Sequence, residues 1–220
     1  MSSAAPAEHV AAFDVDGTLT TRDCVVPFLE LVAGRRSLIG GMLRRPTPVL
    51  AAAARRDRDR LKELAVLCAF RGRTAGDVEQ LGEQFAQQVH TGWLRADTPK
   101  RLAWHQHQGH KVVLVSASLG MYLRPLGRLL GVDGVLCTDA LVDSDGRYTG
   151  AMSGNNCRGP EKIARLRAWL SSSNLENAEL WAYGDSAGDR ELLSAAHHHF
   201  MVKDTLVSAT PPGFGDGDFS

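Results

Sequence analysis

Short apolar runs alternate with amphipathic stretches along most of the chain. Five such runs are followed by a polar or glycine-containing turn and then by a segment that looks helical: residues 10–15, 111–116, 135–138, 180–183 and 199–202. Apolar strands that alternate with helices are typical of a mostly parallel sheet covered by helices on its faces. The pattern therefore predicts an α/β fold with a parallel central sheet.

One segment suggests an antiparallel addition to this sheet. The residues Asp143-Ser144-Asp145-Gly146 have the composition of a turn and lie between two short strand candidates. Asp and Gly are favoured in turns that reverse the chain between adjacent strands. We predict a hairpin beside the main sheet.

The interval from about Val25 to Asp97 breaks the alternation, because it has helical periodicity and no convincing strand. Two apolar stripes at helical spacing are Leu61, Leu64, Ala65, Leu67 and Cys68, and Val78, Leu81, Phe85 and Val89. Such stripes are packing faces. This interval also carries Arg44, Arg45, Arg55, Arg56, Arg58 and Arg60. Interleaved acids at 57 and 59 favour a solvated helix face there, with contact to lipid or nucleic acid as the alternative.

The composition narrows the classes of partner. A length of 220 residues suits one domain with a sizeable insertion. The 25 basic and 25 acidic side chains balance, so no overall field favours nucleic acid or an anionic membrane, and a small molecule is the expected substrate. Four scattered cysteines without a C-x-x-C pair argue against a disulfide framework or a zinc ribbon. With no secretory signal and no long apolar stretch, we expect a cytoplasmic protein without stable membrane insertion.

Two acids, Asp14 and Asp16, come directly at the end of the first predicted strand, ahead of Gly17 and Thr18. Open parallel sheets bind ligands at the carboxyl ends of their strands. Two carboxylates this close repel each other unless a cation or a shared proton intervenes. The spacing therefore predicts a metal site, or an acid and a nucleophile with separate roles. A calcium loop needs further acids at alternate positions and a late glutamate, which this segment lacks.

A second acidic cluster repeats this arrangement. The segment Gly184-Asp185-Ser186-Ala187-Gly188-Asp189 follows the strand predicted at 180–183, so Asp185 is expected at the same sheet edge as Asp14. Carboxylates without a histidine or cysteine partner favour Mg²⁺ over zinc. Taken alone, the cluster is equally well explained as a helix N-cap.

Two further segments add groups suited to a phosphate. The third motif, Ser116-Ala117-Ser118, ends a predicted strand and offers a hydroxyl and backbone N–H groups at the same edge. Lys162 follows Gly159 and Pro160 at the start of a predicted helix. Its charge can neutralise a developing negative charge or hold a carboxylate, whereas a surface lysine is the alternative for Lys162 in isolation.

Taken in order, these motifs resemble the four-motif signature of the haloacid dehalogenase superfamily of phosphohydrolases. The resemblance spans residues from about 10 to 203 and is carried by Asp14-x-Asp16-Gly17-Thr18, Ser116, Lys162 and Gly184-Asp185-Ser186-x-x-Asp189. Leu19-Thr20, Asn156-Cys157-x-Gly159-x-x-Lys162 and Asp189-Arg190-Glu191-Leu192 are similar to subfamily IB, which contains the phosphoserine phosphatases. The resemblance implies a Rossmann-like three-layer sandwich with an inserted helical type-one cap.

The resemblance also implies a division of the chain. Residues 1–24 and 98–210 would form the Rossmann-like core, and residues 25–97 the helical cap. Residues 211–220 are rich in glycine and proline, and we expect them to form a flexible tail.

Each motif residue receives a role from the resemblance. Asp14 would attack phosphorus and form an aspartyl-phosphate, and Asp16 would act as general acid and then general base. Asp14, the backbone carbonyl of Asp16 and Asp185 would bind Mg²⁺, with Asp189 supporting the metal ligands. The remaining residues, Ser116, Ala117 and Lys162, would bind the phosphoryl group.

The implied substrate is a small phosphorylated metabolite, with phosphoserine as one candidate. Phosphoserine phosphatases place a glutamate shortly after the nucleophile and an arginine in the cap. Here Asp23 falls near the glutamate's place, which makes it a candidate substrate-binding residue, and Lys62 or Leu64 falls near the arginine's. Related members act on lipid phosphates, and the apolar segments 38–43 and 49–54 would either contact a bulky substrate or form ordinary helix faces.

Two other functions are compatible with parts of the pattern. A phosphotransferase or mutase of the same superfamily would pass the phosphoryl group to an acceptor other than water. A phospho-accepting receiver domain also uses an aspartate, a hydroxyl residue, a lysine and Mg²⁺, but it lacks the second acid two residues after the acceptor and the large insertion. The sequence leaves a homodimer open.

Overall fold

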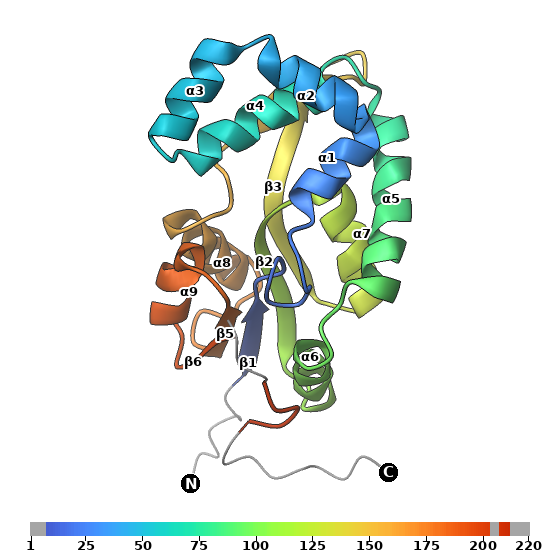
Figure 1. Ribbon diagram of the computed structural model, residues 1–220. Coiled ribbons are helices and arrows are strands. Elements are labelled where there is room, and N and C mark those ends of the chain that lie inside the picture. Colours follow the sequence, from blue (N-terminus) through green and yellow to red (C-terminus); the bar gives the residue numbers. More distant parts are fainter. Residues whose placement is uncertain (1–7, 203–206, 212–220) are drawn as a thin grey trace, which may run out of the picture.

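The computed structural model describes residues 8–202 and 207–211, which form a six-stranded sheet (Figure 1). Its strand order is β4-β3-β2-β1-β5-β6. The strands are β1 (His9–Phe13), β2 (Lys111–Leu119), β3 (Gly134–Val142), β4 (Tyr148–Ser153), β5 (Glu179–Gly184) and β6 (His198–Met201). Strand β4 pairs antiparallel with β3, and the other pairings are parallel. The predicted α/β fold with a mostly parallel sheet is confirmed.

Two details of the sheet differ from the prediction. The turn at 143–146 does join two strands, but β4 extends the main sheet at its edge instead of forming a separate hairpin. Strand β3 also runs to Val142, four residues beyond the predicted end. The last residues of β3 pair with β4 at the edge of the sheet, where Leu141 and Val142 are 44% and 43% exposed. This part of β3 therefore lacks the uninterrupted apolar run by which buried strands are recognised.

The two faces of the sheet are covered by different helices, and alternate residues of each strand serve each face. In β1, Ala11 and Phe13 pack on the side of α6 (Thr98–His107) and α7 (Gly120–Leu130). Val10 and Ala12 pack on the opposite side, with α8 (Pro160–Ser172) and α9 (Arg190–Ser194). The result is the three-layer sandwich that was predicted.

Five helices between β1 and α6 form an insert above the carboxyl ends of the strands (Figure 1). They are α1 (Val25–Ala33), α2 (Arg35–Leu43), α3 (Pro46–Ala54), α4 (Arg58–Phe70) and α5 (Ala75–Gly92). Helices α4 and α5 begin at side-chain caps, because Asp57 accepts a hydrogen bond from the Arg60 N–H at 2.9 Å and Thr74 accepts one from the Asp77 N–H at 3.3 Å.

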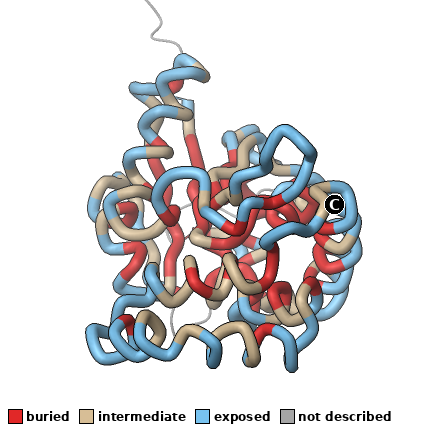
Figure 2. Tube along the Cα trace, turned by 90° about the horizontal axis from the view of Figure 1, so that it is seen from above, coloured by how far each residue is buried: buried red, intermediate tan, exposed pale blue. Residues whose placement is uncertain are grey.

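The insert shares its hydrophobic core with one face of the sheet. Phe28 of α1, Phe70 of α4 and Phe85 of α5 belong to the same buried cluster as Phe13 of β1 and Tyr122 of α7. Helix α5 lies along α7, which covers that face. Figure 2 shows that buried positions gather along the inner strands and that the outer helices are largely exposed. The insert is therefore anchored to the sheet through continuous packing.

Several predictions concern the surface and the ends of the chain. Five of the six arginines predicted on a solvated face, all but Arg45, are exposed. Among the helices of the described residues, none has the length and apolar character needed to span a membrane. Pro211 is the last residue described, so the predicted tail at 211–220 otherwise lies outside the described residues.

A buried histidine in α6 makes stability sensitive to pH. His105 is fully buried, with Nε2 2.9 Å from the Tyr183 hydroxyl and Nδ1 2.8 Å from Nδ1 of His110. Burial, together with the neighbouring His110, lowers the pKa of His105 to about 2. In the unfolded chain a histidine has a pKa near 6.5. Below that pH the unfolded state binds a proton at His105 and the folded state does not, so the folded state becomes less stable as the pH falls.

We therefore expect His105 to reduce the free energy of unfolding by up to about 1.4 kcal/mol for each pH unit below about 6.5. Urea unfolding between pH 7.5 and 4.5 measures this slope. His105→Gln removes the titrating group and is expected to give a shallower pH dependence than the original chain. His199→Gln, at an exposed position, is the matched control and should keep the original slope. An unchanged slope in His105→Gln would contradict the assignment.

Candidate active site

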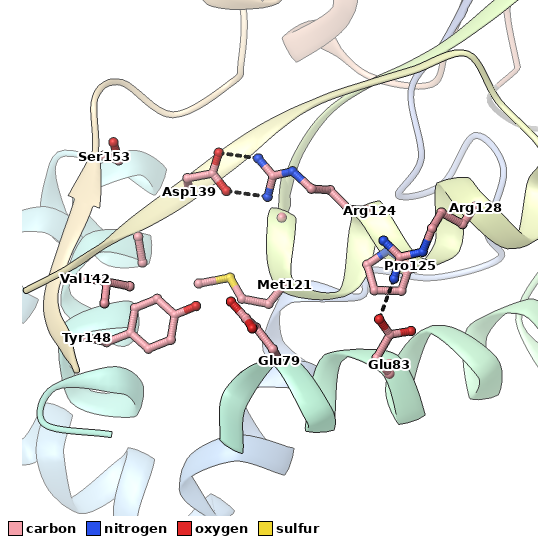
Figure 3. Close-up of a pocket in the computed structure, with 12 residues that line it drawn as sticks. Glu79, Glu83, Met121, Arg124, Pro125, Arg128, Asp139, Val142, Tyr148 and Ser153 are labelled. Carbon is pink, nitrogen blue, oxygen red and sulfur yellow. Dashed lines mark hydrogen bonds and ion pairs between the residues drawn. The ribbon is translucent and has the colours of Figure 1, made fainter. Parts of the chain in front are cut away.

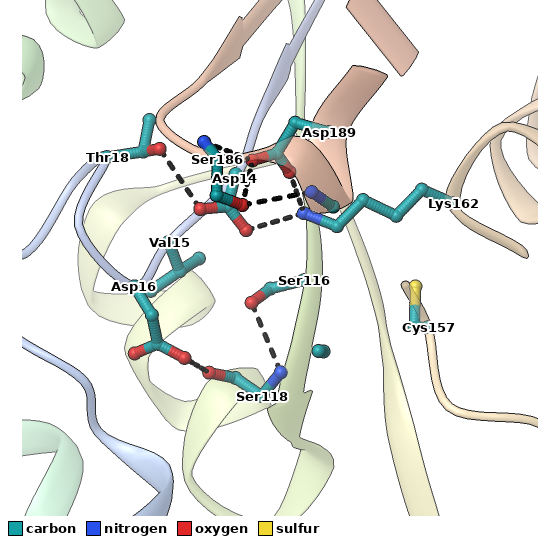
Figure 4. Close-up of polar contacts among 12 residues, drawn as sticks. Asp14, Val15, Asp16, Thr18, Ser116, Ser118, Cys157, Lys162, Ser186 and Asp189 are labelled. Carbon is teal, nitrogen blue, oxygen red and sulfur yellow. Dashed lines mark hydrogen bonds and ion pairs between the residues drawn. The ribbon is translucent and has the colours of Figure 1, made fainter. Parts of the chain in front are cut away.

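Four of the predicted residues meet where three neighbouring strands end, and Figure 4 shows three of them, Asp14, Ser116 and Lys162. Asp14 follows β1, Ser116 lies in the last part of β2, and Asp185 follows β5. Strands β2, β1 and β5 are adjacent and parallel, so their carboxyl ends bring these side chains to one edge. Lys162, in the first turn of α8, reaches the same place.

Lys162 holds two of the acids together. Its Nζ lies 2.6 Å from Oδ1 of Asp14 and 2.5 Å from Oδ1 of Asp189, and its side chain is almost fully buried. Burial alone would lower the pKa of Lys162, but the carboxylates of Asp14 and Asp189 outweigh burial and raise it. Lys162 is therefore a fixed positive charge at the centre of the site. The contact with Asp14 is one of the two roles that the sequence suggested for Lys162, and the contact with Asp189 was not predicted.

The Asp14 carboxylate is fixed at both oxygens. Oδ1 accepts from Lys162, and Oδ2 accepts a hydrogen bond from the Thr18 hydroxyl at 3.0 Å. The backbone N–H of Asp14 donates to the Tyr183 carbonyl at 2.9 Å, which continues the pairing of β1 with β5. Burial raises the pKa of Asp14, and the charge of Lys162 opposes that rise. These contacts orient one carboxylate toward the cavity, as a nucleophile or a metal ligand requires.

The Asp16 carboxylate is held by other partners than the acids that contact Lys162. Its Oδ2 accepts from the Ser118 hydroxyl at 2.5 Å (Figure 4). Its Oδ1 accepts from the Cys24 N–H at 2.8 Å. Burial, and then the negative charge of Asp23, raise the pKa of Asp16 to about 7. A carboxyl group that titrates near neutral pH can both give up and take back a proton there.

Three acids are close enough to share one cation. Asp14, Asp185 and Asp189 each offer a carboxylate oxygen, and the three oxygens lie within 4.8 Å of one another. Burial, followed by the charges of Asp14 and Asp189, raises the pKa of Asp185 to about 6. Among the residues described, neither histidine nor cysteine lines this cavity. An oxygen-only set matches the preference of Mg²⁺, so the residues present fit the expected metal.

Gly17 allows this cluster to form. Its φ of +86° is in the left-handed region, which favours glycine. A Cβ at this position would also collide with the Asp185 carboxylate. Gly17 therefore combines the turn after β1 with the close approach of β5.

Asp189 is held in place from two sides. Its Oδ2 accepts from the Ser186 N–H at 3.0 Å and from the Ser186 hydroxyl at 2.9 Å, while Oδ1 accepts from Lys162. The Ser186 hydroxyl also accepts from the Gly188 N–H at 3.2 Å, so Ser186 and Asp189 form a reciprocal capping box at the N-terminus of the short η1 helix (Ala187–Asp189). This geometry makes Asp189 a rigid partner for Lys162.

The segment 116–118 turns two hydroxyls toward the acids. Ser116 Oγ accepts from the Ser118 N–H at 3.1 Å, which leaves the Ser116 hydroxyl hydrogen available to a ligand. The Ala117 carbonyl accepts from Nζ of Lys62, which comes from α4 of the insert. Ser116 and Ala117 both line the cavity.

A network around Asn156 joins the insert to the core beside this site, and we call it the Asn156 link. Oδ1 of Asn156 accepts from Lys62 Nζ at 2.7 Å and from the Thr138 hydroxyl at 2.8 Å. Its Nδ2 donates to Oδ1 of Asp59 at 2.6 Å. Burial lowers the pKa of Lys62 to about 8. Lys62 and Asp59 lie three residues apart on one face of α4, so both can form hydrogen bonds with the side chain of Asn156.

These groups surround a cavity of about 730 Å³ between the sheet edge and the insert. Its lining includes the six acids Asp14, Asp16, Asp23, Asp59, Asp185 and Asp189 and the four cations Arg58, Lys62, Arg158 and Lys162. All of the predicted site residues line it. Asp23 is exposed, and its Oδ1 accepts from the Val26 N–H at 3.1 Å.

A second cavity, of about 390 Å³, lies between α5, α7 and the β3–β4 edge (Figure 3). Its arginines are already neutralised: Arg124 contacts both carboxylate oxygens of Asp139 at 2.8 and 2.6 Å, and Arg128 pairs with Glu83. The cavity at the sheet edge, with its clustered acids, is the better candidate for chemistry.

Several contacts of the site were not predicted from the sequence. Ser118 was recognised only as part of a motif, although a period of two along a strand places it on the same face as Ser116. The roles of Thr18 and Cys24 in holding the two acids follow from the turn after β1. Lys62, Asp59 and Asn156 come from segments about one hundred residues apart, and no local signal predicts their contact.

Comparison with known proteins agrees with this geometry. Residues 11–194 match the family model of haloacid dehalogenase-like hydrolases. The protein CicA of Caulobacter vibrioides is 36% identical over 187 residues, which cover 85% of this chain and 82% of CicA. A Mycobacterium tuberculosis protein named a probable phosphatase is 27% identical over 205 residues, covering 90% and 70% of the two chains.

Solved structures with the same fold include a protein of unknown function from Bordetella pertussis. It has a TM-score of 0.74 and 24% identity, and the match covers 89% of this chain and 90% of that one. A substrate-bound phosphoserine phosphatase has a TM-score of 0.59 and 15% identity, with 87% and 84% covered. At these identities the structures establish the fold and leave the substrate open.

Proposed function

Because the chain belongs to the haloacid dehalogenase-like hydrolases, we propose that it hydrolyses phosphomonoesters through an aspartyl-phosphate on Asp14. The observation that carries this proposal is the arrangement around Lys162. A buried cation contacts Asp14 and Asp189, and Asp185 lies within reach of both acids. Asp16 does not take part in these contacts and accepts a hydrogen bond from the Ser118 hydroxyl. The site thus combines a positioned nucleophile, an anion-binding charge and an independent proton carrier.

In the first step, a carboxylate oxygen of Asp14 attacks phosphorus and the bond between phosphorus and the ester oxygen breaks. Asp16 gives a proton to the departing alkoxide, so the alcohol leaves neutral. The hydrogen bonds from Ser118 and the Cys24 N–H keep the Asp16 carboxyl in one orientation. Lys162 and the Ser116 hydroxyl would bind the phosphoryl oxygens as negative charge spreads over them.

In the second step, water replaces Asp14 on phosphorus. Asp16, now ionised, takes a proton from the attacking water, the bond between the Asp14 oxygen and phosphorus breaks, and inorganic phosphate forms. Asp14 and Asp16 thereby return to their starting states. One acid handles the proton in both directions, as the two halves of the reaction require.

We propose that Asp14, Asp185 and the backbone carbonyl of Asp16 hold Mg²⁺ and that Asp189 supports this set through Lys162. When bound, the ion neutralises negative charge on the phosphoryl group. The insert at residues 25–97 would act as the cap over the site and residues 98–210 as the remainder of the core. In this arrangement Asp23 lies on the substrate side, where a small phosphorylated metabolite would bind.

A phosphotransferase uses the same first step and differs only in the acceptor. The size of the cavity leaves room for an alcohol in place of water, so product analysis with added glycerol or glucose is needed to separate the two reactions. Free phosphate that equals the alcohol released identifies hydrolysis, and a shortfall in phosphate identifies transfer.

The test of the proposed function is release of phosphate from p-nitrophenyl phosphate. With 5 mM Mg²⁺ we expect turnover, and with EDTA we expect a loss of at least about a hundredfold, because three clustered carboxylates then lack their counter-charge. Restoring Mg²⁺ should restore the rate. Turnover that is equal in EDTA and Mg²⁺ would refute the metal requirement, and a stable phosphoprotein without turnover would favour a receiver-type function.

A further inference from the structure

The catalytic cavity has two chemically different walls. The core supplies Asp14, Asp16, Asp185 and Asp189 together with Ser116, Lys162 and Ser186, whereas Arg58, Asp59 and Lys62 come from α4 of the insert. The insert supplies the apolar part, which consists of Val25, Val26 and Leu29 of α1, Met42 of α2, and Leu61 and Ala65 of α4. Four of these side chains, those of Val25, Met42, Leu61 and Ala65, line the cavity and are only half-buried, so part of their apolar surface stays accessible.

The charged residues of the insert do not offset this apolar wall. Asp59 and Lys62 belong to the Asn156 link. Asp59 accepts a hydrogen bond from the amide nitrogen of Asn156, and Lys62 donates one to its amide oxygen. Arg58 of α4 and Asp23, which precedes α1, also line the cavity, but both are exposed and therefore stay in contact with water at its surface. A phosphorylated amino acid brings an ammonium and a carboxylate, and burying either without a partner is costly. The wall facing the acids therefore suits an apolar group better than a zwitterion.

The remaining cation of the lining lies on the core side. Arg158 is half-buried, and its Nε lies 3.2 Å from the point that a Cβ on Gly188 would occupy, next to the metal-binding acids. It adds positive charge at the phosphate end and leaves the insert wall unchanged.

From this division we propose that the substrates are phosphomonoesters of apolar alcohols, with the phosphate at Asp14 and the alkyl or aryl group against α1, α2 and α4. This proposal rests on the proposed phosphatase function. A cavity of about 730 Å³ has room for an alcohol much larger than serine. Val26 lies on the lining and is 54% exposed, so the apolar wall continues to the surface and a longer chain can extend outward.

The experiment measures kcat/KM for n-alkyl monophosphates from ethyl to octyl, with L-phosphoserine and p-nitrophenyl phosphate in parallel. Burial of one methylene group is worth about 0.8 kcal/mol, so we expect about a threefold to fourfold rise per methylene until the cavity is filled. The kcat/KM for L-phosphoserine should be lower than that for butyl phosphate. A series that is flat with chain length, or phosphoserine as the fastest substrate, would overturn the proposal.

A pair of variants shows whether the insert wall is responsible. Leu61→Asn places an amide on the lining and is expected to reduce the rate with octyl phosphate at least tenfold more than the rate with ethyl phosphate. Leu141→Asn makes the same change on β3 at a leucine that does not line the cavity, and it should keep the original series. If both variants give the same series, the insert wall does not bind the alcohol.

Two sources of such a substrate are separated by a further arm. Phosphatidic acid in phosphatidylcholine vesicles tests a membrane lipid, and octyl phosphate below its micellar concentration tests a soluble ester. Turnover of either supports the proposal and identifies the source. If p-nitrophenyl phosphate is not hydrolysed, the proposed function itself fails. If it is hydrolysed while the alkyl series stays flat, only the inference about the alcohol fails.

Discussion

Replacing Asp14 by asparagine is expected to reduce kcat by at least about a thousandfold while the chain still folds. The amide has nearly the same shape as the carboxylate and can still accept a hydrogen bond from Lys162, but it cannot attack phosphorus as an anion. The measurement is phosphate release under saturating p-nitrophenyl phosphate and Mg²⁺. Near-ultraviolet circular dichroism checks that the tertiary structure is kept.

The matched control for this variant is Asp145→Asn. Asp145 is an exposed aspartate in the turn between β3 and β4, remote from the site, and the same chemical change there should leave kcat within about twofold. If Asp14→Asn retained a tenth of the original kcat, Asp14 would not be the nucleophile. Mass spectrometry after rapid acid quenching should also detect an added phosphoryl group on the original chain and none on Asp14→Asn.

Lys162→Met is expected to lower the free energy of unfolding by about 3–5 kcal/mol in EDTA, in addition to abolishing turnover. Methionine keeps the length of the side chain but removes the charge that lies between Asp14 and Asp189. The two buried carboxylates then face each other without compensation. Because protonation of one acid relieves this repulsion, the loss should be smaller at pH 5 than at pH 8.

Lys111→Met provides the comparison for stability. Lys111 also contacts an aspartate, with Nζ 2.8 Å from Oδ1 of Asp133, but both side chains are substantially exposed. Surface ion pairs contribute little, so this variant should lose less than about 1 kcal/mol. Urea unfolding at both pH values measures the difference. Equal losses in the two lysine variants would show that the charge of Lys162 is not required to balance the buried acids.

Much of the fold was predictable because the strands that build the sheet are short, apolar and regularly followed by turns. Strands β1, β2 and β5 are buried on both faces, so their sequences show unbroken apolar runs. The continuity of β3 through Val142 was not predicted, since its last residues pair at the edge of the sheet and Leu141 and Val142 are 44% and 43% exposed. Exposure weakens the pattern on which such predictions depend.

The composition of the site was predictable to a similar extent, and for a comparable reason. Asp14, Ser116 and Asp185 each follow or end a strand, and parallel strands bring such positions together whatever lies between them. The connection of Lys162 to Asp189 and of Lys62 to Asn156 depends on how helices from distant segments settle on the sheet. Those contacts are set by tertiary packing, which the local pattern does not encode.

The hydrophobic cluster shared by the insert and the sheet has a consequence for how this protein can change over evolutionary time. Phe28 and Phe85 both contact the ring of Tyr122 on α7, with ring centroids 4.9 and 5.2 Å apart respectively. An insert transplanted from another chain would meet this ring with mismatched side chains and leave voids or clashes. Substitutions that retune the insert for a new substrate must therefore be accompanied by changes on α7, so the two parts co-evolve and are not interchangeable modules.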